Sequence, residues 1–183
     1  MKMYEMLEKI LADTTNWLSF AEAKNAALIA FNGVWGAICI DKFLECKSKE
    51  IAFIYAFLCI VCIVAVIISL ISFMPKMFTS DKFEKYLKSK LKQQSVKDNM
   101  LFYGDIFKYS PAEYFESFQK NILKLSGNDI EKYSDDKKMF EKQLALQIVT
   151  LSAIAYKKYY LFKIALRITI IPLVLGVMGI MIA

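Results

Sequence analysis

The longest run of hydrophobic positions extends from Ile51 to Pro75, and none of its 25 residues is charged. About 20 predominantly apolar residues in an α-helix cross the roughly 30 Å hydrocarbon core of a bilayer, where a helix satisfies its own backbone polar groups. A buried helix of a soluble protein would normally show a polar stripe, whereas only Tyr55, Ser69 and Ser72 interrupt this surface. The pattern predicts a transmembrane helix that ends before the proline.

Two other apolar blocks predict two more spans. Ile164–Ala183 holds a single charge, Arg167, near its start, and Asn25–Ile40 is weaker because it contains two asparagines and two glycines. We therefore predict an all-α membrane protein with about three transmembrane helices and a cytoplasmic helical segment between the second and the third. The predicted division is residues 1–24 as an N-terminal amphipathic helix, 25–75 as a transmembrane hairpin, 76–163 as the cytoplasmic region, and 164–183 as a span continuous with the preceding helix.

The region between the second and third spans contains helical patterns separated by turn-forming residues. Residues 82–94 are strongly basic and carry a narrow apolar stripe at helical spacing. Ser110, Pro111 and Glu113 offer an N-cap oxygen, a proline in the first turn and the carboxylate of a capping box. They predict a helix that begins at this point and stops at 126–128.

Two longer helices are expected to enter the membrane. One opens at Asp135 and continues without a break into the third span, as a rod of about 40 residues that couples the two compartments. The other is the amphipathic pattern of residues 3–23. We expect an interruption at Thr14 and Thr15, with a new helix that starts near Asp13 or Thr14 and runs into the first span without a break.

The distribution of charge orients the spans. Lys76–Lys163 holds 17 lysines against 11 aspartates and glutamates, whereas the loop expected at 41–50 holds three of each. Because cytoplasmic flanks carry an excess of Lys and Arg, we expect a cytoplasmic N-terminus, an external loop at 41–50 and an external C-terminus. The net charge of +6 suits anionic lipid headgroups rather than a nucleic acid polymer, because the basic residues border the spans.

The composition excludes several kinds of chemistry. The chain has no histidine and no glycine-rich phosphate loop, so His general bases, Ser-His nucleophiles and most zinc sites are unavailable. Cys59 and Cys62 have CxxC spacing, but they lie inside an uninterrupted apolar helix, where cysteines serve as small packing residues. We expect no enzyme activity, no metal and no cofactor.

Helical periodicity does not explain the segment from Asp98 to Phe107. Two aspartates, Asn99, Tyr103 and a glycine within ten residues suit a small-ligand site. The same residues suit a loop in which Asp98 and Asn99 cap a short helix while the aromatic side chains pack on neighbouring helices. Both interpretations stay open.

Short motifs in a fixed order resemble the transmembrane Pycsar effector family, formerly a domain of unknown function. The similarity covers roughly residues 15–183 and depends on the order and spacing of the motifs rather than on any single one. The motifs are Glu22-Ala23-Lys24, Asn25-Ala26, Asn32-Gly33, Pro75-Lys76, Asn99 to Ile106, Tyr109 to Tyr114, Gln147-Ile148 and Lys157-Lys158-Tyr159.

This resemblance implies a membrane effector of bacterial antiphage defence. In that family's setting a partner cyclase makes a cyclic pyrimidine mononucleotide, cCMP or cUMP, and the effector impairs the inner membrane, which halts the infected cell before phage mature. On this basis we expect ligand contacts of three kinds: an aromatic ring stacked on the base, a polar partner for the base edge, and a lysine for the phosphate. The corresponding residues are Phe102 and Tyr103, Asn99 and Asp105, and Lys76 and Lys157.

Two positions depart from the family pattern. Glu22 stands where an aspartate is expected, and Lys76 stands where an arginine often follows the proline; a lysine does not reproduce the bidentate phosphate contact of an arginine. Glycines on the first and third spans allow close helix approach, either within one subunit or between copies in a homo-oligomer. The alternative function is a structural or scaffold membrane protein that recruits a soluble partner through its basic cytoplasmic helices.

Overall fold

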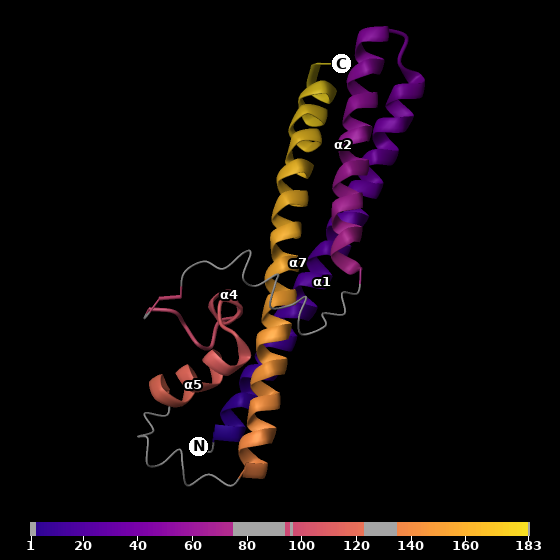
Figure 1. The fold of residues 1–183 in the computed structure, drawn as a ribbon. Coiled ribbons are helices and arrows are strands. Elements are labelled where there is room, and N and C mark those ends of the chain that lie inside the picture. Colours follow the sequence, from indigo (N-terminus) through magenta and orange to yellow (C-terminus); the bar gives the residue numbers. More distant parts are fainter. Residues whose placement is uncertain (1–2, 75–93, 96, 123–134, 183) are drawn as a thin grey trace. The chain divides into compact units, whose positions relative to one another are not determined.

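The computed structural model describes residues 3–74, 94, 95, 97–122 and 135–182, and all of its regular elements within these ranges are helices (Figure 1). The elements are α1 (Met3–Glu45), α2 (Lys49–Phe73), α4 (Tyr103–Ile106), α5 (Pro111–Asn121) and α7 (Asp135–Ile182). Three helices of the described chain, α1, α2 and α7, are long and apolar enough to cross a membrane. The predicted all-α membrane fold with three spans is confirmed.

The chain forms two compact units. The first unit is built from Met1–Ser19 and Lys76–Tyr156, and the second from Phe20–Pro75 and Lys157–Ala183. Helices α1 and α7 contribute residues to both units. The second unit contains α2 and the apolar blocks of α1 and α7, so it is the unit whose composition suits a bilayer.

The core of the first unit is made of apolar side chains from α1, α4, α5 and α7. Five of its 15 buried residues are aromatic, and all five come from α5 and the segment just before it. Its fully buried members include Leu7, Ile106, Tyr114, Phe118, Ile148 and Val149.

Buried polar contacts join the helices of the second unit. The Asn25 amide nitrogen donates to Ser72 Oγ at 3.2 Å, which joins α1 to α2. The Asn32 amide nitrogen donates to Thr169 Oγ1 at 2.9 Å, which joins α1 to α7. The asparagines that weaken the apolar pattern of the first span therefore lie at helix contacts, where their amide nitrogens donate to hydroxyls of neighbouring helices.

Gly176 of the second unit permits a close approach of its helices. A Cβ atom at Gly176 would lie 2.7 Å from Trp35 Cζ2, whereas one at Gly36 would make an ordinary contact, 3.7 Å from Cys62 Cβ. Gly176 therefore serves packing within one chain. Gly33 differs, since nothing lies within 4 Å of the position that its Cβ would take.

Two boundary predictions are wrong. Helix α1 does not break at Thr14 and Thr15, whose hydroxyls donate to the carbonyls of Ile10 and Leu11 and so stay within the helix. The loop expected at 41–50 is also shorter, since α1 continues to Glu45 and α2 begins at Lys49.

Three helix boundaries are confirmed. The second span ends at Phe73, before the proline, α7 runs as one helix of 48 residues from Asp135, and α5 begins at Pro111. The predicted end of this last helix at 126–128 is wrong, since α5 ends at Asn121 with Ile122 as its C-cap. Lys76 and all but the last residue of the predicted helix at 82–94 lie outside the described residues.

Candidate functional site

A cluster of charged side chains organises the loop that precedes α5. Lys108 is only 8% exposed, and its Nζ lies 2.7 Å from Asp98 Oδ1 and 2.5 Å from Asp105 Oδ1. Tyr109 donates its hydroxyl hydrogen to Asp98 Oδ2 at 3.2 Å, and the backbone N–H of Ser95 donates to the same oxygen at 2.8 Å. One buried cation thus holds two carboxylates from opposite ends of the loop.

The electrostatics of this cluster favour its charged state. Burial alone would raise the pKa of Asp98, but hydrogen bonds from Lys108, the Ser95 N–H and Tyr109 hold that pKa below its ordinary value of 3.8. Burial would lower the pKa of Lys108, and the bonds to Asp105 and Asp98 raise it instead. The ammonium of Lys108 is therefore paired with two of the protein's own carboxylates.

The two polar residues predicted to bind a base edge take part in the same loop. The Asn99 N–H donates to Asp105 Oδ2 at 3.1 Å, and the Asn99 side-chain oxygen accepts from the Leu101 N–H at 2.9 Å. These are the local side-chain to backbone bonds that stabilise turns. The structure thus gives Asn99 and Asp105 a role in shaping the loop.

Helix α5 begins with the predicted capping box. Ser110 Oγ accepts from the Glu113 N–H at 3.3 Å, and a Glu113 carboxylate oxygen accepts from the Ser110 N–H at 2.9 Å. The hydrogen bond from the Ser110 backbone also contributes most to holding the pKa of Glu113 below its ordinary value. Tyr114, fully buried, donates to the Met100 carbonyl at 3.0 Å and so anchors the helix to the loop.

The two predicted stacking residues form an aromatic cluster with a third ring. The centroid of Tyr103 lies 4.6 Å from that of Phe102 and 5.6 Å from that of Trp17, which comes from the N-terminal part of α1. Phe102 is 39% exposed and Trp17 is 41% exposed. The cluster therefore presents aromatic surface to the outside of the first unit.

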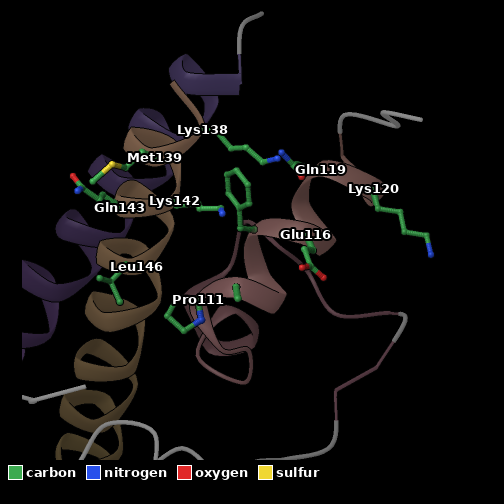
Figure 2. Close-up of a pocket in the computed structure, with 11 residues that line it drawn as sticks. Pro111, Glu116, Gln119, Lys120, Lys138, Met139, Lys142, Gln143 and Leu146 are labelled. Atoms are coloured by element: carbon green, nitrogen blue, oxygen red, sulfur yellow. The ribbon is translucent and has the colours of Figure 1, made fainter. Parts of the chain in front are cut away.

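A groove between α5 and α7 is the second notable surface of the first unit. It has a volume of about 950 Å³, within the usual range for small-molecule sites. In Figure 2, Lys138 and Lys142 extend from α7 toward α5, whereas Lys120 points away from α7. Its lining consists of Pro111, Ala112, Phe115, Glu116, Gln119, Lys120, Lys138, Met139, Lys142, Gln143 and Leu146. The Tyr109 to Tyr114 motif contributes Pro111 and Ala112 to this groove, but its other lining residues lie outside the sequence motifs, on the rest of α5 and on α7.

Two of the short motifs meet in the second unit. Lys158 forms an ion pair with Glu22. Lys24 lies 4.4 Å from the ring centroid of Phe20 and 5.4 Å from that of Tyr159. These contacts bring the Glu22-Ala23-Lys24 motif of α1 beside the Lys157-Lys158-Tyr159 motif of α7, at the polar end of the apolar blocks.

The predicted ligand residues do not gather at one described place. Asn99, Phe102, Tyr103 and Asp105 lie in one loop of the first unit, whereas Lys157 belongs to the second unit. Lys76 lies outside the described residues. A phosphate-binding lysine beside the aromatic cluster therefore stays a prediction.

The family to which the chain belongs explains why these motifs occur together. The family model described as the Pycsar effector protein domain, PycTM, matches residues 6–183. The chain belongs to the Pycsar effector family. No curated protein and no solved structure shows significant similarity to it.

Family membership and the fold agree with one another. A Pycsar effector is a membrane effector of bacterial antiphage defence, and this chain has three helices suited to the bilayer among its described residues. Among the described residues, these motifs lie at helix contacts in the second unit, in the loop and capping box of the first, and on α7 in the core of the first unit. They therefore have structural roles in this chain.

Proposed function

We propose that this Pycsar effector is activated by a cyclic pyrimidine mononucleotide, cCMP or cUMP, that a partner cyclase supplies, and that it then impairs the inner membrane and aborts infection. The observation that carries this proposal is the family match over residues 6–183, together with a folded helical unit whose chain lies mainly between the second and third spans. Such a unit offers surfaces for a soluble ligand, which the apolar blocks do not.

The orientation follows from charge. Lys24, Lys157, Lys158 and Lys163 border the apolar blocks at the ends that lead into the first unit. The opposite end, at 41–50, has equal numbers of lysines and acidic residues. The positive-inside tendency then places the first unit and the N-terminus in the cytoplasm, where a cyclase product accumulates.

Coupling between ligand and membrane requires an element that both units share. Helices α1 and α7 each contribute to both. A nucleotide shifts the packing of these helices only if it binds the active arrangement more tightly than the resting one. Assembly into a homo-oligomer is part of the proposal, and chemical crosslinking with and without nucleotide tests it.

The experiment adds cCMP and cUMP separately to liposomes that contain the protein and follows the membrane potential. Cyclic AMP and protein-free liposomes are the controls. We expect one pyrimidine nucleotide to dissipate the potential, and cyclic AMP to leave it unchanged. An unchanged potential with both pyrimidine nucleotides, at confirmed incorporation and with the ligand on the side of the first unit, contradicts the proposal.

The sequence-based ligand contacts need their own variants. Alanine at Asn99 or Asp105 would disturb the loop itself, because their polar groups bind its backbone, so a lost response would not identify a ligand contact. Alanine at Phe102 and Tyr103 removes the aromatic surface and its packing on Trp17, but leaves the loop's backbone hydrogen bonds to Asn99 and Asp105 in place. If these two rings stack on the base, the double variant loses the nucleotide response and keeps its folded first unit.

A further inference from the structure

We infer that the groove between α5 and α7, rather than the aromatic cluster, is the nucleotide-binding site of the first unit. This inference rests on the proposed function and names the place at which the ligand binds. Three properties of the groove favour it: its size, the unpaired positive charge on its walls, and an amide that lines it. The lysines and the amide lie outside the sequence motifs.

The charge in the groove is available to a ligand. Lys138 and Lys142 lie one helical turn apart on α7 and reach toward α5 (Figure 2). Within the described residues, neither lysine has an ion pair or hydrogen bond. Lys108, beside the aromatic cluster, is instead held by two carboxylates. A cyclic phosphodiester carries one negative charge, and a lysine ammonium binds such a group as a point charge.

The amide of Gln119 suits the edge of a pyrimidine base. Gln119 lines the groove from α5 and is 4% exposed as a whole residue. A side-chain amide that meets the edge of a base adds hydrogen bonds to the affinity of the ligand. Because an amide both donates and accepts, Gln119 can pair with uracil or with cytosine.

Apolar side chains complete the site. Phe115 lies on the α5 wall and is 3% exposed, while Leu146 on α7 is 48% exposed and open to the groove. Small-molecule sites combine such apolar walls with a few polar groups that fix orientation. The groove therefore offers contacts for the base and the phosphate of a nucleotide: the exposed side chains of Met139 and Leu146 for the base, an amide for its edge and lysines for the phosphate.

The site also lies on the helix that reaches the membrane unit. Lys138, Lys142 and Leu146 belong to α7, which is helical up to Ile182. A ligand that binds both walls favours one spacing of α5 from α7. The groove can therefore report nucleotide binding through a helix whose far part packs on α1 in the second unit.

The test uses the full chain in nanodiscs and measures the Kd of cCMP and cUMP by calorimetry. One variant reverses both groove charges, Lys138→Glu with Lys142→Glu. Its matched control, Lys9→Glu with Lys97→Glu, makes the same change in net charge at exposed positions of the first unit outside the groove. Since each charge-assisted hydrogen bond contributes roughly tenfold or more to affinity, we expect the groove variant to bind at least about 30-fold more weakly and the control to stay within about twofold.

Gln119→Glu provides a second measurement that does not depend on total affinity. A carboxylate accepts from the exocyclic amine of cytosine but has nothing to donate to the O4 atom of uracil. We expect the ratio of the Kd for cUMP to that for cCMP to rise about tenfold or more relative to the parent protein. An unchanged ratio overturns the assignment of Gln119 to the base edge.

The results separate this inference from the proposed function. If the parent protein binds a nucleotide and the groove variant binds it equally well, the groove is not the site, while the proposed function stands. Loss of binding only in Phe102→Ala with Tyr103→Ala assigns the site to the aromatic cluster and also overturns the inference. If the parent protein neither binds nor responds to cCMP or cUMP, both proposals fail. Circular dichroism and hydrogen exchange confirm that each variant keeps its folded first unit.

Discussion

Replacing Lys108 by methionine should loosen the loop before α5 by about 3 kcal/mol. The substitution keeps much of the apolar stem and removes the cation that lies 2.7 Å from one Asp98 oxygen and 2.5 Å from one Asp105 oxygen. Loss of one partner of a buried ion pair costs about 3–5 kcal/mol, because the remaining charge is left uncompensated. The Asp105 side chain is 26% exposed, so water offsets part of the loss and the lower end of that range is expected.

Hydrogen exchange in nanodiscs measures this change locally. The Ser95 and Asn99 amides donate to the two carboxylates, so their protection follows the opening of the cluster. A cost of about 3 kcal/mol corresponds to a loss of protection of about 100-fold, since each 1.4 kcal/mol is a factor of ten. Peptides from α2 are the internal control and should exchange as in the parent protein.

A double variant tests whether the effect arises from the charges. Asp98→Asn combined with Lys108→Met leaves one carboxylate instead of two, so its cost should be smaller than the sum of the two single costs. Protection that is unchanged in Lys108→Met would refute the reasoning, because it would mean that solvent already screens the cluster. Additive costs in the double variant would place the effect in packing rather than in the ion pairs.

Three further predictions follow from the same structure. Tyr114→Phe removes a buried hydroxyl that donates to a loop carbonyl at 3.0 Å and should destabilise the first unit by about 1–2 kcal/mol in hydrogen exchange; no change would show that water replaces the bond. Gly176→Ala should destabilise the second unit, because the added Cβ would lie 2.7 Å from a Trp35 ring carbon. Its matched control, Gly33→Ala, adds a Cβ that meets nothing within 4 Å and should be neutral or slightly stabilising in thermal unfolding. Equal melting temperatures of the two variants would contradict this. The pKa of Asp98 is lower in the folded protein than its ordinary value of 3.8. The contribution of Asp98 to the stability of the first unit should therefore be complete above about pH 5 and should decline as the pH falls below 3.8. Equal melting temperatures at pH 3 and pH 6, followed by near-UV circular dichroism, would exclude this contribution.

The sequence was a good guide wherever a local rule applies. Ser110, Pro111 and Glu113 satisfy the first turn of α5 from within four residues, so the start of that helix was predicted to the residue. The apolar run of α2 could be recognised as a transmembrane helix without knowledge of its neighbours, because its length and hydrophobicity alone match the bilayer. The prediction failed at Thr14 and Thr15, since their hydroxyls bond back to the carbonyls of their own helix.

The candidate site was harder to predict, because its residues are distant in the chain. The motif around Asn99 contains the residue types of a ligand site, but the structure uses the polar groups of Asn99 and Asp105 to shape the loop. The groove combines Gln119 of α5 with Lys138 and Lys142 of α7. Each of these looks like an ordinary polar position on an amphipathic helix, and no periodicity indicates that the two helices face each other.

The sequence by itself determined that this protein lies in a membrane and where its main helices lie in the chain. Membrane residence, the spans and the capped helix depend on hydrophobicity and hydrogen bonding over a few neighbouring residues, and these are local properties. The tertiary structure alone decided which polar groups bond to one another within the protein and which remain available to a ligand. Asn32 is satisfied by Thr169, and Lys108 by Asp98 and Asp105. Such pairings arise only when distant segments pack, because burial removes water and leaves each polar group with the partners that the fold brings within reach.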